Sequence, residues 1–270
     1  IFPPSLIPGE SSMPLETSTP QGRVRMIASA TLSGPMPPAS RNGRCSPPGT
    51  WSQSKACPLP PLPPGCFALQ PSEEVAVKLV EQIRDFRPHV IITYDENGGY
   101  PHPDHLKVHE TSMIAWDRAG EAGFAPEAGE PWTPLKLYYS HGFILQRMEL
   151  LHDLIVARGE QSPYEMMIKR WKENEADIMS RVTTRVDCAE YFGQRAAALT
   201  AHATQIDPAG AFLASPVEDQ QRVWPTEEFE LAASRVPAPL PEDDLFAGIE
   251  PETSPETDPE NSVRNGKEAR

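Results

Sequence analysis

The chain has 270 residues and a formal net charge of −14, and 39% of its residues are hydrophobic. This charge argues against nucleic acid or an anionic membrane as the main partner, because both favour basic surfaces. No run approaches the roughly 18 apolar residues that span a bilayer, and the first residues do not resemble a signal peptide. The four cysteines form no C-x-x-C pair, which favours a reduced, cytoplasmic protein. The sequence does not indicate the oligomeric state.

Residues 1–65 differ in composition from the rest of the chain. They hold 15 of the 32 prolines, and residues 1–70 contain two acidic residues, Glu10 and Glu16. Helical or strand periodicity is absent before Cys66, and the proline clusters cannot sustain a helix or a central strand. We expect residues 1–65 to be disordered. The tail 251–270, rich in Pro, Glu, Ser and Thr, is expected to be disordered as well.

The first predicted elements surround residue 90. A helix is expected to begin at Ser72, as its N-cap, and to run to about Phe86, with apolar residues at helical spacing. Residues 89–94 are mostly β-branched and predict a buried strand. A loop at 95–104 then leads into a helix at 105–119.

Further along, we expect a strand at 135–140, a helix at 144–156, a strand at 182–188, and helices at 190–204 and 226–234. Strands that alternate with helices predict an α/β fold with a Rossmann-like, open, mostly parallel sheet and helices on both faces. The acidic run 242–244 is interpreted as a solvated surface.

The candidate chemistry lies in one loop, Gly98-Gly99-Tyr100-Pro101-His102-Pro103-Asp104-His105, called the histidine loop below. It follows a predicted buried strand and leads into a helix, where ligand sites form in open α/β sheets. Two prolines stiffen it, and two imidazoles with a carboxylate suit a metal site or an acid–base site. The alternative is an exposed turn in which Asp104 caps the helix; the position at a strand end favours a functional site.

Other histidines suggest weaker hypotheses. His105 and His109 have the spacing of half a zincin motif, but Leu106 stands where that motif has its glutamate, so the zincin interpretation is disfavoured. His141, at a strand end, is a candidate for lining the same cleft and binding substrate. His202 either points from its helix toward the cleft or occupies a plain surface or core position.

Residues 94–105 resemble the second conserved motif of the LmbE-like de-N-acylase superfamily, also called the GlcNAc-PI de-N-acetylase superfamily. Residues 137–143, 201–208 and 224–231 resemble the branch of this superfamily that acts on mycothiol S-conjugates. The resemblance extends from about Pro58 to Glu250. We therefore expect an LmbE-like domain at 66–250 that is incomplete at its N-terminus.

The resemblance implies a zinc-dependent amidase of detoxification. Its substrate would be a small thiol-sugar conjugate, cut to a mercapturic acid and glucosaminyl-inositol. The family holds Zn²⁺ with two histidines and an aspartate, and of these only the later histidine maps here, to His105. Tyr100 would polarise the amide carbonyl, and His102 would stabilise the oxyanion or protonate the leaving amine. Asp104 would orient His102, and zinc would activate the water.

The family's opening motif, Ala-His-Pro-Asp-Asp-Glu, has no counterpart in the chain. That motif supplies two zinc ligands and the general base, so we expect the family's first strand and helix to be missing. We hypothesise that residues 1–57 are translated in a shifted reading frame, or that the chain begins from a misplaced start. If the upstream DNA encodes the motif in no frame, this hypothesis is refuted.

Two alternatives to the amidase stay open. The first is the related deacetylase that acts on N-acetylglucosaminyl-inositol in mycothiol synthesis. The second is an inactive remnant that binds mycothiol-like sugars or other proteins. Turnover of an S-conjugate compared with that of the acetylated sugar separates them.

Overall fold

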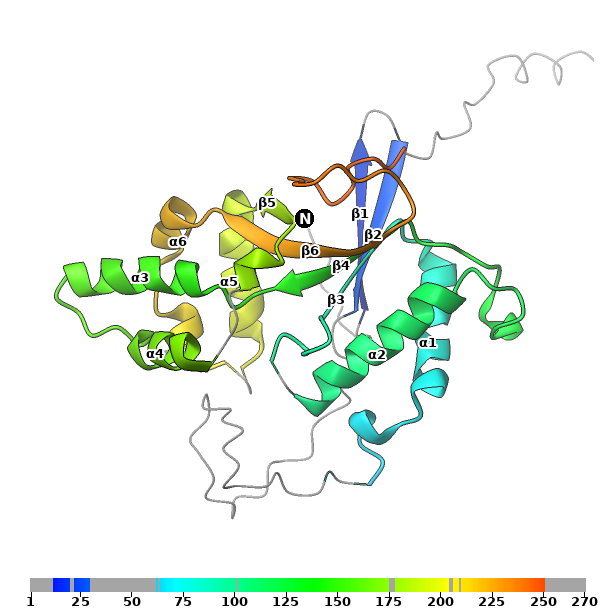
Figure 1. Cartoon of the computed structure of the whole chain (residues 1–270), viewed down its shortest axis with the longest axis horizontal. Coiled ribbons are helices and arrows are strands. Elements are labelled where there is room, and N and C mark those ends of the chain that lie inside the picture. The colour runs from blue at the N-terminus through cyan, green and yellow to red at the C-terminus, as the bar shows by residue number, and fades with distance from the viewer. Residues whose placement is uncertain are drawn as a thin grey trace, which may run out of the picture. The chain divides into compact units, whose positions relative to one another are not determined.

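The computed structural model describes residues 12–19, 22–29, 62, 64–100, 102–174, 178–203, 206–208 and 210–250 (Figure 1). The chain divides into two compact units. We call the one that contains Thr93–Thr133 the helical unit. The other, called the sheet unit, contains Arg87–Ile92 and the chain from Pro134 onward. No helix in the described ranges is long and apolar enough to cross a membrane.

Two helices packed together form the helical unit, α1 (Ser72–Phe86) and α2 (Pro103–Arg118). The first matches the predicted helix, and its buried side chains recur at helical spacing: Ala76, Leu79, Val80 and Ile83. Helix α2 begins earlier than expected because Pro103 occupies its first turn, where a missing N–H costs nothing.

A buried arginine shapes the loop after α2. Arg84 is 3% exposed, and its guanidinium donates to five main-chain carbonyl oxygens at 2.7–3.3 Å: those of Ala119, Glu121, Phe124, Ala125 and Gly129. Because the main chain supplies the acceptors, the loop folds around the side chain.

Within the described residues the sheet has six strands: β1 (Ser12–Thr19), β2 (Gly22–Ser29), β3 (Val90–Thr93), β4 (Lys136–His141), β5 (Thr184–Asp187) and β6 (Thr226–Ser234). Their order is β1-β2-β3-β4-β6-β5. The α/β class is therefore as expected. Strand β6 pairs antiparallel with both β4 and β5, so the sheet is mixed.

Strands β1 and β2 lie in the region expected to be disordered, and the structure differs from the prediction there. Strand pairing is made by main-chain groups, so a strand can form without apolar alternation when a neighbouring strand is present. Met26 packs against the core of the sheet unit. The expectation for the tail 251–270 lies outside the described residues.

The predicted helix at 226–234 is wrong, because these residues form β6. Glutamate, leucine and alanine favour helix locally. However, Phe229 and Leu231 pack against the sheet-unit core that contains Val90 and Tyr138. Hydrogen bonding to strands on both sides then outweighs the local preference.

The described part of the sheet unit also contains four α-helices: α3 (Leu145–Ala157), α4 (Glu165–Asn174), α5 (Phe192–Ala201) and α6 (Val217–Val223). The first and third confirm predicted helices, whereas α4 and α6 were not predicted. Helices α3 and α4 share a small core made by Met148, Leu151, Ile155, Tyr164 and Ile168.

The interpretation of residues 242–244 as a solvated surface is wrong for Glu242, which is 7% exposed. Its carboxylate accepts from Lys136 Nζ at 2.6 Å, Tyr138 Oη at 2.6 Å and Thr184 Oγ1 at 3.2 Å. Lys136 is itself fully buried. This network ties the end of the described chain to strands β4 and β5.

Candidate active site

Asp95, directly after β3, organises the histidine loop. It is buried, and its Oδ1 accepts from the main-chain N–H of Asn97 at 3.1 Å and of Gly99 at 2.9 Å. Gly98 and Gly99 both adopt positive φ, at 70° and 68°, which glycine allows at low cost. Asp95 was not among the predicted site residues, although an aspartate before Asn-Gly-Gly is a typical start of a side-chain-bonded turn.

His105 is held in a fixed orientation by two contacts. Its Nδ1–H donates to the carbonyl oxygen of Gly98 at 2.8 Å, and its ring stacks on Tyr94 with centroids 4.3 Å apart and planes 8° apart. Since Nδ1 carries the proton, the neutral ring has its lone pair on Nε2. A backbone bond of this kind is how proteins orient a metal-binding histidine.

Burial lowers the pKa of His105, and the neighbouring charge of His102 lowers it further, whereas the Gly98 carbonyl and Asp104 raise it. The net direction favours the neutral imidazole. This is the form that binds a metal ion.

His102, not Asp104, caps helix α2. Its Nδ1 accepts from the main-chain N–H of Asp104 at 3.1 Å. The neutral ring therefore carries its proton on Nε2, which makes that atom a hydrogen-bond donor. The contact between the two residues runs through the main chain of Asp104, so the orienting role expected of its carboxylate stays a prediction.

Tyr100 is the third predicted site residue in the loop. Its ring centroid lies 4.5 Å from that of His105 and 6.2 Å from that of His102. Burial raises the pKa of Tyr100, so its hydroxyl stays protonated at neutral pH and can donate. The predicted residues Tyr100, His102 and His105 are thus close together.

The described residues do not complete a zinc site. A catalytic zinc takes three protein ligands, and no group of three His, Cys, Asp or Glu side chains in the described ranges is placed to hold a metal ion. His105 has the orientation expected of one ligand, and His109 makes a main-chain bond of the same kind. His109, one turn further along α2, donates from Nδ1 to the carbonyl oxygen of Tyr94 at 3.0 Å.

The two histidines from the later part of the chain have different surroundings. His141 belongs to the sheet unit, is buried at the carboxyl end of β4, and donates from Nε2 to Glu230 Oε2 at 2.9 Å. His202 is exposed at the end of α5 and donates from Nδ1 to the Ala198 carbonyl at 2.9 Å. His202 is therefore not a core residue.

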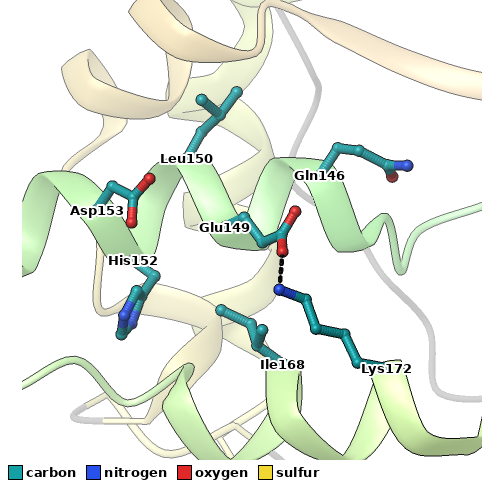
Figure 2. Close-up of a pocket in the computed structure, with 7 residues that line it drawn as sticks. All are labelled: Gln146, Glu149, Leu150, His152, Asp153, Ile168 and Lys172. Carbon is teal, nitrogen blue, oxygen red and sulfur yellow. Dashed lines mark ion pairs between the residues drawn. The ribbon is translucent and has the colours of Figure 1, made fainter.

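A cavity of about 620 Å³ lies between α3 and α4 (Figure 2). Its lining is mixed: Gln146, Glu149, Leu150, His152, Asp153, Ile168 and Lys172. Lys172 Nζ and Glu149 Oε1 form an ion pair across it at 2.5 Å. Of the two carboxylates that line the cavity, Glu149 is thus paired with Lys172, and the predicted catalytic residues are not among the lining residues.

The sequence around the histidine loop matches a known protein family. Residues 44–116 match the PIG-L family model, GlcNAc-PI de-N-acetylase, and this match includes the whole loop and begins upstream of Pro58. The chain belongs to this family.

Among its relatives, mycothiol S-conjugate amidase of Streptomyces coelicolor is 54% identical over 194 residues, which cover 71% of this chain and 66% of that protein. The 1D-myo-inositol 2-acetamido-2-deoxy-alpha-D-glucopyranoside deacetylase of Streptomyces scabiei is 35% identical over 189 residues, covering 69% and 58%. The 1D-myo-inositol 2-acetamido-2-deoxy-alpha-D-glucopyranoside deacetylase 2 of Frankia alni is 36% identical over 188 residues, which cover 65% of this chain and 62% of that protein. The chain thus spans slightly less than two thirds of these relatives.

A solved structure, that of the conserved protein TT1542 from Thermus thermophilus, aligns with a TM-score of 0.39 and 20% identity over 66% of each chain.

Proposed function

We propose that the chain hydrolyses the amide bond of mycothiol S-conjugates, releasing a mercapturic acid and glucosaminyl-inositol. The observation that carries this proposal is the 54% identity to an amidase named for that substrate, compared with 35% and 36% for the deacetylases. The histidine loop supports it, because its residues supply the donors that amide hydrolysis needs.

Hydrolysis adds a hydroxyl group to the carbonyl carbon and a proton to the leaving nitrogen as the C–N bond breaks. The carbonyl oxygen becomes negatively charged in between, and donors aimed at it lower the barrier. In this proposal the Tyr100 hydroxyl polarises the carbonyl. His102, whose proton is on Nε2, stabilises the oxyanion or protonates the leaving amine.

The proposal includes Zn²⁺ as cofactor, with His105 as one ligand through Nε2. The stacked ring of Tyr94 and the bond to Gly98 support this role, since they hold the ring before a metal arrives. The proposal also places the enzyme in the cytoplasm. In support, Cys66 and Cys188 are free thiols, as expected for a reducing compartment.

The test is to compare turnover of a bimane S-conjugate of mycothiol with that of N-acetylglucosaminyl-inositol, with zinc added. Faster turnover of the conjugate is expected, and His102→Ala should lose it while His202→Ala, an exposed control, retains it. If the chain hydrolyses the acetylated sugar faster than the conjugate, the deacetylase alternative replaces the proposal. The similarity to the deacetylase relatives favours that alternative. No hydrolysis of either compound, together with binding of the conjugate, would favour the remnant that only binds.

A further inference from the structure

Asp95 is a buried acid that the proposed chemistry does not use. The residue is 3% exposed, and it belongs to the helical unit together with the whole histidine loop. An ionised carboxylate only accepts hydrogen bonds, and burying one is costly unless donors surround it. The donors that Asp95 meets, and the groups to which those donors are joined, therefore indicate what this residue does.

One peptide unit, which joins Gly98 to Gly99, connects Asp95 to His105. Its N–H, on the Gly99 nitrogen, donates to Asp95 Oδ1 at 2.9 Å. Its carbonyl oxygen, on Gly98, accepts from His105 Nδ1 at 2.8 Å. The carboxylate, the peptide unit and the imidazole thus form a continuous chain of two hydrogen bonds, which we call the Asp95 relay.

The two hydrogen bonds of the Asp95 relay strengthen each other. Hydrogen bonds in a chain polarise one another, and a buried site screens this effect less than water does. A bond to an ionised acceptor is also about twice as strong as a bond to a neutral one. The Asp95 carboxylate therefore polarises the peptide unit, so that the Gly98 oxygen becomes a better acceptor for the His105 proton. In consequence, the lone pair on His105 Nε2 becomes more basic.

The turn around the relay holds its members in place. Asp95 Oδ1 also accepts from the main-chain N–H of Asn97 at 3.1 Å, and the Gly98 N–H donates to the Asp95 carbonyl oxygen at 2.9 Å. The ring of Tyr94 stacks on His105 with centroids 4.3 Å apart. The peptide unit and the imidazole are thus both oriented by contacts outside the relay, which favours a fixed geometry over an occasional contact.

We propose that Asp95 is a positioning residue that acts on His105 through this peptide unit, as a carboxylate does when it contacts a metal-binding histidine directly. It holds the neutral imidazole with the proton on Nδ1 and makes Nε2 a stronger electron-pair donor. The inference rests on the proposed function for the use of that lone pair, which is to bind the zinc of the amidase. A residue that only shaped the turn would need an acceptor oxygen at this place, but not a negative charge.

The variant Asp95→Asn separates these two roles, because asparagine keeps an oxygen that can accept from Asn97 and Gly99 but carries no charge. Long-range proton–nitrogen NMR of the full chain, at a pH where the His105 ring is neutral, measures the tautomer, and hydrogen exchange of the Gly99 amide measures the turn. Wild-type His105 should show one tautomer, with the proton on Nδ1. Asp95→Asn should keep the protection of Gly99, show a mixture of tautomers, and move the Nδ1 proton resonance upfield. Asp117→Asn, at an exposed acid of α2, is the matched control and should behave as the wild type.

Turnover of the S-conjugate is the second readout. Loss of a group that orients a metal-binding histidine lowers metal affinity or activity by about 10- to 100-fold, and Asp95→Asn should lose turnover by that factor. If Asp95→Asn does not keep the turn, Asp95→Ser replaces it, because a serine hydroxyl also accepts main-chain N–H bonds in turns.

A variant with protected Gly99 and an unchanged His105 tautomer and proton resonance would overturn the inference, and so would a wild-type His105 that carries its proton on Nε2. The two proposals fail separately. A chain that hydrolyses no conjugate, but shows the tautomer change in Asp95→Asn, supports the relay and refutes the amidase. A chain in which Asp95→Asn hydrolyses the conjugate as fast as the wild type supports the amidase and overturns the inference.

Discussion

Gly98 and Gly99 are neighbours in the histidine loop with the same left-handed backbone, φ +70° and +68°, but they differ in what surrounds them. A Cβ added to Gly98 would lie 2.8 Å from His105 Cβ and 3.0 Å from the Tyr100 carbonyl oxygen. A Cβ added to Gly99 would meet Tyr94 Cδ1 at 3.5 Å, an ordinary contact. Alanine substitution at the two positions therefore separates backbone strain from displacement of His105.

Both variants should lose about 1–2 kcal/mol of the free energy of unfolding, because a non-glycine residue is strained in this conformation. Gly98→Ala should lose about 1–3 kcal/mol more, the usual cost of overpacking. Since the crowded atoms belong to His105, this variant should also bind less zinc. It should lose turnover as well, because a shift of about 1 Å at a catalytic group can cost about a hundredfold in rate.

The assays are urea denaturation, zinc content of the purified protein, and turnover of the S-conjugate, each run on both variants and the wild type. Gly99→Ala serves as the matched control for the backbone effect. Equal losses of stability and equal zinc content in the two variants would refute the argument that the Gly98 position holds His105 in place.

The remaining predictions concern single side chains. His105→Ala should lose bound zinc, measured by inductively coupled plasma mass spectrometry. His102→Ala should keep the zinc, and its turnover should fall by about 10²–10³-fold. Full activity in His102→Ala would show that the role assigned to His102 is wrong. Glu242→Ala should lose about 3–5 kcal/mol of the free energy of unfolding, since it leaves Lys136 buried and unpaired. Asp243→Ala, at the exposed neighbour, should change it by less than about 0.5 kcal/mol, and similar losses in the two variants would contradict the buried pair.

The sequence was sufficient where the structural cause is local. The helix Ser72–Phe86 follows from apolar residues at helical spacing, and β3 follows from a run of β-branched residues. The histidine loop was located because Gly-Gly and two prolines punctuate the chain between a strand and a helix. Tyr100, His102 and His105 are close in sequence, so their proximity in the structure needed no long-range information.

The tertiary structure decided what depends on residues far apart in the chain. Residues 226–234 have helical propensity, yet they form β6 because β4 and β5 supply hydrogen-bonding partners on both sides. The sequence predicts that Glu242 is a surface residue. In the structure it is buried and paired with Lys136, which lies 106 positions earlier in the chain. The hydrogen bond between His141 and Glu230, which lie 89 positions apart, also depends on tertiary structure. Periodicity and propensity describe a segment and its immediate neighbours, whereas burial of a charge depends on which distant segment packs against it. Only the folded chain contains that information.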